Sequence, residues 1–400
     1  MAATPTRDPP EIDESRLPDP FDDVDASPQD EAVRPPGAPH PIITWIDERI
    51  GLEELSNVAR KKEVPVHRHD FWYYFGGITL FFFVLQLFTG LLLLVYYQPG
   101  INVAHPSVQR ITSQIEFGWL IRSVHSWSAN LMLLSAFVHM FSVYFMKAFR
   151  KPRELTWFSG IVLLAMGMAF GFSGYLLPWD QLAVAGAKIA LKSIGGGPGG
   201  DVITRLAGAP MDASGQPQVG GVALQRFFAL HVAVLPALYM PLLGLHLWLV
   251  QKHGNAIPPS EVGRPTTKTV PFFPNFLLKD VVVWLLCLNL LTALAALFPW
   301  ELGEVADVAK AMPPGIHPEW YFMSQYELLK LVPPRVFGID GEMIGMGLFT
   351  GAAGVWAMVP LWDRGTDAGL RLRRINYVGF FMLVGLIALT LLGYAGWPKS

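Results

Sequence analysis

Hydrophobic residues in this chain gather into seven long runs separated by short polar and charged segments. Each run holds about 20 residues with few charges, the length that a helix needs to cross the roughly 30 Å hydrocarbon core of a bilayer. The runs lie near 71–97, 117–146, 156–178, 224–251, 278–299, 342–362 and 375–396. The pattern therefore predicts an all-α integral membrane protein, a helical bundle with seven transmembrane helices.

Composition agrees with a membrane setting, because 52% of the residues are hydrophobic and only 16% are charged. Residues 1–40 are rich in Pro, Asp and Glu and lack the basic start and apolar core of a signal peptide. We therefore expect a disordered acidic tail there and a first membrane helix that is retained. Residues 41–65 place Ile, Trp and Leu at helical intervals beside charges, which predicts an amphipathic helix on the membrane surface. An ordinary soluble helix fits this stretch equally well.

Four histidines lie inside the apolar runs, where polar side chains are costly and tend to mark function. His125 and His139 are 14 residues apart, and His231 and His246 are 15 apart. Each interval corresponds to about 21 to 22 Å along a helix axis and keeps the two imidazoles within roughly 60° of each other around it. Two such helices side by side offer two stacked bis-histidine sites, suited to two haems at different depths. A single buried histidine is more often a packed residue, but two pairs with near-equal spacing favour the haem interpretation.

Basic residues at the ends of the runs predict the orientation of the chain. Segments on the N-terminal side of the membrane carry more Lys and Arg than those on the other side, so the positive-inside rule places the N-terminus in the cytoplasm. The second and fourth runs then both start at the outer face. His125 is thereby paired with His231 near the outer face, and His139 with His246 nearer the inner face. We expect the membrane to be the inner membrane of a bacterial cell.

Glycines recur in the neighbouring runs at the same interval as the histidines. Gly76 and Gly90 are 14 residues apart, and so are Gly160 and Gly174. A flat macrocycle can approach a helix closely where no side chain intervenes, so this register favours haem binding over simple helix packing, which glycines also serve. Cys287 is the only cysteine, which excludes a disulfide framework, a thiolate iron–sulfur cluster and a C-x-x-C-H site for covalent haem.

Four motifs carry a resemblance to a known family. They are Arg122-Ser-Val-His125, Gly174-Tyr-Leu-Leu-Pro-Trp179, Arg226-Phe-Phe-Ala-Leu-His231 and Pro318-Glu-Trp-Tyr321. Over residues 41–396 the chain resembles cytochrome b of the quinol-oxidising cytochrome bc complexes. It looks like a fused form of the seven helices that the chloroplast and cyanobacterial branch divides between two polypeptides. The resemblance implies two non-covalent b haems, of low and high potential, and two quinone sites on opposite faces, with Arg122 and Arg226 among the cofactor-binding residues.

Some positions depart from the family. Tyr74 stands where the chloroplast branch carries a cysteine for an extra haem, so no covalent haem is expected. Ser142 stands where an arginine often lies near a haem propionate. The interval between the two histidines of the fourth run is one residue longer than the other, and Pro236 and Pro241 lie within it. Because proline removes a backbone donor, we expect a local kink or bulge that absorbs the extra residue.

The segment between the fifth and sixth runs holds the candidates for the outer site. Oxidising a quinol releases two protons, and Glu319 is our candidate acceptor, because a partly apolar setting raises the pKa of a carboxyl group. A solvated, idle side chain is the alternative for an isolated Glu. Tyr321 and Tyr175 are expected to act beside it. By resemblance, the other residues of the quinone pocket are Phe172, Gly186, Pro318, Trp320 and Tyr326.

The inner site is expected at Lys279 and Asp280, at the inner start of the fifth run. This pair is similar to one that serves protonation of reduced quinone in respiratory members of the family, although a Lys-Asp pair at a membrane boundary is otherwise an ordinary anchor. Residues 193–223 contain a Gly-rich stretch that predicts a flexible outer loop. The expected divisions are the acidic tail (1–40), the surface helix (41–65), a four-helix dihaem domain (66–255) and a three-helix domain with the Pro-Glu-Trp-Tyr motif (256–400).

We therefore expect the cytochrome b subunit of a bc-type complex. It bifurcates electrons from quinol at the outer face, passes one through both haems to quinone at the inner face, and couples this to proton translocation. Because the chain lacks ligands for an iron–sulfur cluster and a c-type haem, the expected partners are a Rieske protein and a c-type cytochrome subunit, in a homodimeric complex in a lipid membrane, without nucleic acid.

Two other classes of protein stay open at this point. A dihaem b membrane anchor of a dehydrogenase or hydrogenase would also use paired histidines, but it would not need an outer quinol-oxidising loop. A transporter with broken helices would place prolines and ionisable groups at the membrane midplane. Binding of b-type haem would argue against the transporter.

Overall fold

The structure, a computed structural model, describes residues 41–50, 62–262, 268–310, 315–363, 365 and 370–396. The predicted acidic tail and residues 51–61 of the predicted surface helix lie outside these ranges. Residues 41–50 form the helix α1 (Pro41–Ile50), on which Ile42 and Trp45 are exposed. This helix belongs to a unit that ends at Val58, and all later elements belong to a second unit.

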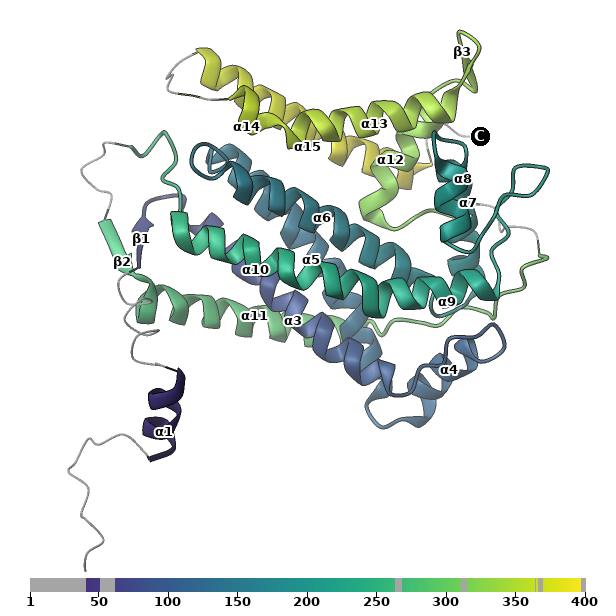
Figure 1. Cartoon of the computed structure of the whole chain (residues 1–400), viewed down its shortest axis with the longest axis horizontal. Coiled ribbons are helices and arrows are strands. Elements are labelled where there is room, and N and C mark those ends of the chain that lie inside the picture. Colours follow the sequence, from purple (N-terminus) through teal and green to yellow (C-terminus); the bar gives the residue numbers. More distant parts are fainter. Residues whose placement is uncertain are drawn as a thin grey trace, which may run out of the picture. The chain divides into compact units, whose positions relative to one another are not determined.

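Long helices make up most of the second unit. Figure 1 shows α3 (Tyr74–Leu94), α5 (Gly118–Phe145), α6 (Glu154–Tyr175), α10 (Leu235–His253) and α11 (Leu277–Leu297) running side by side. Helix α3 packs along α5, α6 packs along α10, and α11 contacts both α3 and α5. The four helices α3, α5, α6 and α10 therefore bring the histidines of the second and fourth runs together with the glycines of the first and third.

Six helices in the described part of the chain are long and apolar enough to cross a membrane. They cover Asp70–Leu94, Gly118–Phe145, Glu154–Tyr175, Gly221–His253, Phe272–Leu297 and Arg374–Ala395. Large apolar side chains such as Leu286 and Phe381 are exposed on them, as expected for surfaces that face lipid. The predicted all-α membrane bundle is confirmed.

The predicted span at 342–362 is divided into α13 (Gly341–Ala357) and α14 (Val359–Trp362). Pro360 stands in the first turn of α14, and in a continuous helix its ring would meet the carbonyl of Trp356. The 17 residues of α13 rise about 26 Å, somewhat less than the hydrocarbon core of about 30 Å. The predicted span is therefore interrupted at Met358, between the two helices. The last span is part of α15 (Leu370–Ala395).

Two short antiparallel pairs stand outside the helices. β1 (Glu63–Val66) pairs with β2 (Lys268–Pro271), and β3 (Arg335–Val336) pairs with β4 (Ile339–Asp340). Residues 63–65, predicted as the end of the surface helix, are therefore strand. The reason is local, because Pro65 lacks the backbone donor that a helix interior needs and the valines on either side favour strands.

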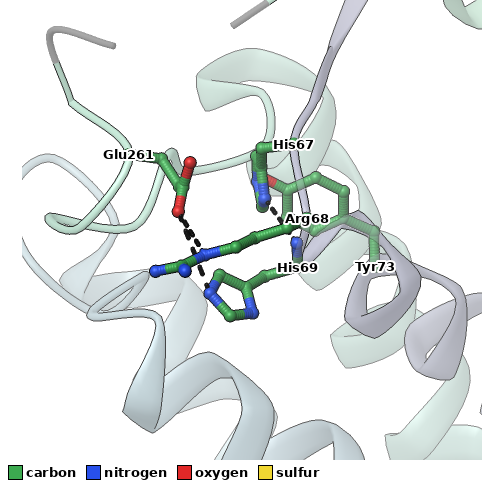
Figure 2. Close-up of polar contacts among 5 residues, drawn as sticks. All are labelled: His67, Arg68, His69, Tyr73 and Glu261. Carbon is green, nitrogen blue, oxygen red and sulfur yellow. Dashed lines mark hydrogen bonds and ion pairs between the residues drawn. The ribbon is translucent and has the colours of Figure 1, made fainter. Parts of the chain in front are cut away.

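A polar cluster fixes the connection between β1 and α3 against the segment that follows α10 (Figure 2). Arg68 donates through Nε to Oε1 of the buried Glu261 at 2.7 Å, and Nε2 of His69 lies 3.9 Å from the same oxygen. The backbone N–H of His69 donates to Nδ1 of His67 at 3.0 Å, so the ring proton of His67 is on Nε2. Nε2 donates this proton to the Tyr73 hydroxyl at 2.7 Å. Burial lowers the pKa of His67, in keeping with this neutral ring. The cluster thus holds the start of α3 in place.

Shorter helices complete the unit. They are η2 (Asp70–Tyr73), α4 (Ala104–Gln114), α7 (Gln181–Gly195), α8 (Gly200–Leu206), α9 (Gly221–Ala229), η3 (Leu230–Val234), η4 (Phe272–Phe276) and α12 (Trp320–Leu331). The predicted flexible loop at 193–223 thus contains the end of α7, all of α8 and the start of α9. Ala209 and Val219 from this segment are buried in one cluster with Trp179 and Leu191. The segment is packed, and its glycines separate short helices.

Candidate functional site

The histidine pair predicted for the outer haem lies between α5 and η3. The ring centres of His125 and His231 are 6.4 Å apart, and the ring planes meet at 71°. A metal ion bound to one nitrogen of each ring at about 2 Å, with roughly 1 Å from nitrogen to ring centre, separates the ring centres by about 6 Å. The observed spacing therefore fits a metal centre held by both imidazoles. The described residues contain no group of three or more His, Cys, Asp and Glu that could hold a metal ion.

The pair predicted for the inner haem lies further along the same helices. His139 on α5 and His246 on α10 are close enough to interact electrostatically. The structure thus brings together both pairs that the sequence predicted, each with one histidine from the second run and one from the fourth.

A π-helical turn accounts for the unequal spacing of the histidines. The turn is η3, which contains His231 and joins α9 to α10. A π turn accommodates one residue more than an α turn, so 15 residues in this helix cover nearly the same rise as 14 in α5. Pro236 follows in the first turn of α10, and Pro241 lies inside it. The expected bulge is confirmed.

Each of the four predicted glycines lies against one of the four histidines. A Cβ atom built on the glycine would meet the Cε1 atom of the ring at 2.7 Å for Gly174 and His231, 3.0 Å for Gly76 and His139, 3.2 Å for Gly160 and His246, and 3.3 Å for Gly90 and His125. The sequence assigned these glycines to the approach of a macrocycle. In the structure their missing side chains leave room for the imidazoles, so any larger residue would displace the rings.

Hydroxyl groups hold three of the imidazoles by Nδ1. His125 lies 2.9 Å from Oγ1 of Thr89, His246 lies 2.9 Å from Oγ of Ser159, and His231 lies 3.0 Å from Oγ of Ser173. Each hydroxyl also donates to a backbone carbonyl of its own helix, so it accepts from the Nδ1–H of the histidine. This tautomer leaves the lone pair of Nε2 available for a metal.

These three hydroxyl residues were missed from the sequence, although each directly precedes one of the four glycines. That regular position was a signal which could have identified them. The fourth histidine differs. Nδ1 of His139 has no hydrogen-bond partner among the described residues, and Phe75 precedes the glycine that faces it.

A cavity of about 430 Å³ lies between α6, α7, α12 and the segment that leads into α12. Its volume and its mostly apolar lining are typical of a pocket for a small organic ligand. Seven of the predicted pocket and catalytic residues line it, namely Phe172, Tyr175, Gly186, Pro318, Glu319, Tyr321 and Tyr326. Sequence positions more than 140 residues apart thus meet in one pocket, as the resemblance implied.

Glu319 is the acidic residue of this cavity. It precedes α12 in an extended conformation, and its carbonyl accepts from the backbone N–H of Phe322 at 2.8 Å. Burial raises the pKa of Glu319. Burial and the charge of Glu319 raise the pKa of Tyr321, and Tyr175 also lies within electrostatic range of Glu319. A half-buried carboxylate near two phenols can accept a proton from a bound hydroxyl group.

Trp320 is not among the residues that line this cavity, and its assignment to the quinone pocket stays a prediction. Its indole Nε1–H donates to Oδ1 of Asn130 on α5 at 2.8 Å, and its ring packs beside Phe137 at 6.0 Å. Successive residues of a helix point about 100° apart. Because Tyr321 faces the cavity at the start of α12, Trp320 faces α5.

The two predicted cofactor-binding arginines donate to backbone carbonyls of the segment after α11 and of the end of α8. Arg122 is buried and bonds to the carbonyls of Trp300 and Glu301, the latter at 3.0 Å. Arg226 bonds to the carbonyl of Leu206 at 3.0 Å. A guanidinium has five N–H donors, so these bonds use only part of its capacity. The binding of a cofactor by either side chain stays a prediction.

The side chains of Lys279 and Asp280 point in different directions from α11. Asp280 is buried and faces α3, where its Oδ1 lies 3.1 Å from the position of a Cβ on Gly77. Lys279 is exposed, because neighbouring residues of a helix do not face each other. Oδ1 of Asp280 has no hydrogen-bond partner among the described residues. Since Gly77 adjoins the glycine that faces His139, the carboxyl group of Asp280 lies near the inner histidine pair.

Ser142 is buried on α5, within one helical turn of His139. Its Oγ donates to the backbone carbonyl of His139 at 2.7 Å. Tyr74, at the position of the absent cysteine, stacks on Phe276 with ring centres 4.9 Å apart. Both side chains therefore pack within the bundle.

Comparisons with known proteins agree with this geometry. Two family models match, described as cytochrome b/b6/petB over residues 61–254 and cytochrome b(C-terminal)/b6/petD over residues 306–399. The chain is 42% identical over 360 residues to a cytochrome bc complex cytochrome b subunit of Chlorobaculum thiosulfatiphilum, with 88% of this chain and 81% of that protein covered. It is 39% identical over 220 residues to cytochrome b6 of Rippkaea orientalis, with 54% and 94% covered.

A solved structure described as a hyperthermophilic respiratory Complex III matches with a TM-score of 0.75 at 29% identity, and the match covers 88% of this chain and 91% of that one. The shorter match to cytochrome b6 covers nearly all of that protein but about half of this chain, as expected for a fused form. The chain is therefore an integral membrane protein of the cytochrome b/b6 family, whose members bind b-type haem.

Proposed function

We propose that this chain is the cytochrome b subunit of a bc-type complex that oxidises quinol at the cavity around Glu319 and reduces quinone near Asp280. The observation that carries this proposal is the combination of two stacked histidine pairs in one four-helix bundle with a mostly apolar cavity that contains a carboxylate. A dihaem anchor of a dehydrogenase needs the histidine pairs but not the cavity.

Two non-covalent b haems are assigned to the histidine pairs, the outer one to His125 and His231 and the inner one to His139 and His246. Haems held by these four histidines would supply one-electron transfer across the membrane. The protein contributes orientation, because the glycines leave room for the rings and the hydroxyl groups hold Nδ1 of three of them.

At the outer cavity, Glu319 accepts a proton from the bound quinol. The apolar wall formed by residues such as Phe172 excludes water, and Tyr175 and Tyr321 supply phenol groups within electrostatic range of the carboxylate. Because burial raises the pKa of Glu319, its carboxylate is a stronger base than a solvated one, which favours proton transfer.

At the inner face, Asp280 supplies a proton to reduced quinone. Its carboxyl group is buried next to Gly77. Lys279, which is exposed on the neighbouring helix position, delivers protons from the aqueous side rather than contacting the same substrate atom. Proton uptake inside and release outside together make the reaction translocate charge.

The proposed function also implies an orientation in the membrane and a set of partner proteins. The N-terminus lies in the cytoplasm of a bacterial cell with the chain in its inner membrane, residues 66–255 form the dihaem domain, and residues 256–400 carry the quinol-oxidising segment. One electron from each quinol leaves to a Rieske iron–sulfur protein and then to a c-type cytochrome subunit, in a homodimeric complex. The relative from Chlorobaculum is named as a subunit of a cytochrome bc complex, which supports this assignment.

Substitution of Glu319 tests the proposal. We expect Glu319→Gln to lower quinol-dependent reduction of cytochrome c by about 100-fold, the usual range for loss of a general base, with both haems retained. Glu304→Gln is the matched control, because that side chain is 86% exposed. Unchanged turnover of Glu319→Gln, or a purified wild-type complex that binds haem but oxidises no quinol, would reject the proposed reaction.

A further inference from the structure

His317 stands directly outside the cavity that contains Glu319. Its side chain is exposed, whereas the residues on either side of it, Ile316 and Pro318, line the cavity. The alternation has a local cause, because proline holds the residue before it in an extended conformation and successive side chains of an extended chain point to opposite sides. His317 therefore faces outward where its two neighbours face inward.

Two tyrosines connect this imidazole with the cavity. The ring centre of His317 lies 6.5 Å from that of Tyr326, with the planes at 90°, and Tyr326 lines the cavity. The ring centre of Tyr394 on α15 lies 6.2 Å from that of His317, and Tyr394 is within electrostatic range of Glu319. Phenol hydroxyls both donate and accept hydrogen bonds. The rings of Tyr326 and Tyr394 thus lie beside His317, and the first lines the cavity while the second is within electrostatic range of Glu319.

We propose that His317 receives the proton that Glu319 takes from quinol and releases it to the aqueous phase on the outer side. This inference rests on the proposed function. After one transfer the carboxyl group of Glu319 is neutral, and a second quinol can react only when that proton has left the mostly apolar cavity. Imidazole is the side-chain group that both gains and loses a proton readily near neutral pH. The relay moves one proton from Glu319 to the imidazole and then to water, which restores the carboxylate and the neutral ring.

The charged pair beside Tyr326, Lys330 and Glu327, has little net effect on the charge of His317. Nζ of Lys330 lies 5.6 Å from the ring centre of Tyr326 and pairs with Oε2 of the buried Glu327 at 3.1 Å. Because this cation and this anion offset each other, the pair neither repels a protonated imidazole strongly nor holds it. Glu319 is the carboxyl group of the cavity whose charge changes in the proposed reaction.

The test uses the purified complex, with quinol-dependent reduction of cytochrome c as the readout. His317→Gln keeps a polar side chain but takes up no proton near neutral pH. We expect it to slow turnover by about 10-fold, less than the roughly 100-fold or more for a group that acts in the transition state. Free imidazole added to the assay should restore the rate in proportion to its concentration. His105→Gln is the matched control, because His105 lies in another outer segment, where its Nε2 bonds to the carbonyl of Gly303 at 2.8 Å. It should turn over at the wild-type rate without a response to imidazole.

Two results would overturn the relay. One is an unchanged rate for His317→Gln, and the other is a slow variant that imidazole does not restore, which would indicate a packing role. Glu319→Gln, measured in the same preparation, separates this inference from the proposed function. A slow Glu319 variant beside an unaffected His317 variant rejects the relay alone, whereas a wild-type complex without quinol oxidation rejects the function itself.

Discussion

Replacing Gly174 with alanine should weaken binding of the outer haem while sparing the inner one. The added Cβ would stand 2.7 Å from Cε1 of His231, 3.2 Å from Nδ1 and 3.4 Å from Nε2. Carbon atoms pack at about 3.5 to 4.0 Å, so the imidazole must retreat by about 1 Å. The retreat also strains the bond between its Nδ1 and Ser173.

The cost of this shift can be given as an order of magnitude. Overpacking a tight interior usually costs about 1–3 kcal/mol. If the strain is relieved when the haem leaves, affinity at the outer site falls by about 5- to 150-fold. Gly90→Ala should have a smaller effect at the same haem, because its Cβ would stand 3.3 Å from His125.

The assay is haem content per chain together with a redox titration of the b-haem absorbance. For Gly174→Ala we expect the outer component to be depleted or shifted and the inner component to be unchanged. Gly244→Ala on α10 is the control, because a Cβ there meets nothing within 4 Å and alanine favours a helix by about 1 kcal/mol. If Gly174→Ala kept both components at wild-type content and potential, the assigned contact between the glycine and the histidine would be refuted.

Three further outcomes follow. Thr89→Val removes the hydroxyl that accepts from Nδ1 of His125, so the imidazole becomes less basic and the potential of the outer haem rises; an unchanged titration would contradict this. Because burial raises the pKa of Glu319 above its ordinary 4.5, its carboxylate forms only at higher pH, and quinol oxidation should rise with pH through that raised pKa in the wild type but not in Glu319→Gln. Trp320→Phe should lose the hydrogen bond to Asn130 and about 1 kcal/mol of stability. The KM for quinol should not change, and a raised KM would show that Trp320 contacts the quinol.

Features that depend on local periodicity were predictable from the sequence. The apolar runs, the pairing of histidines between the second and fourth runs and the bulge near Pro236 all follow from the rise and rotation of a helix. The hydroxyl residues that hold the histidines, such as Thr89, were predictable too. Each directly precedes one of the regularly spaced glycines, and that regularity is visible in the sequence. The break before Pro360 was also a local signal, but the apolar character of the run concealed it.

Features that depend on how a helix is rotated against its neighbours were not predictable. Trp320 and Tyr321 are adjacent in the sequence, yet only one can face the cavity, and packing against α5 decides which. Lys279 and Asp280 are separated in the same way by the contact between α11 and α3. The carbonyl partners of Arg122 lie about 180 residues away in the chain, so no local pattern identifies them.

We propose that two b haems are held one above the other between α5 and α10. The most direct measurement is haem content per purified chain with a redox titration, on the wild type and on His139→Ala. We predict two haems that titrate as two components in the wild type and loss of the inner one in the variant. A colourless wild-type protein, or a variant that retains both components, would contradict the account.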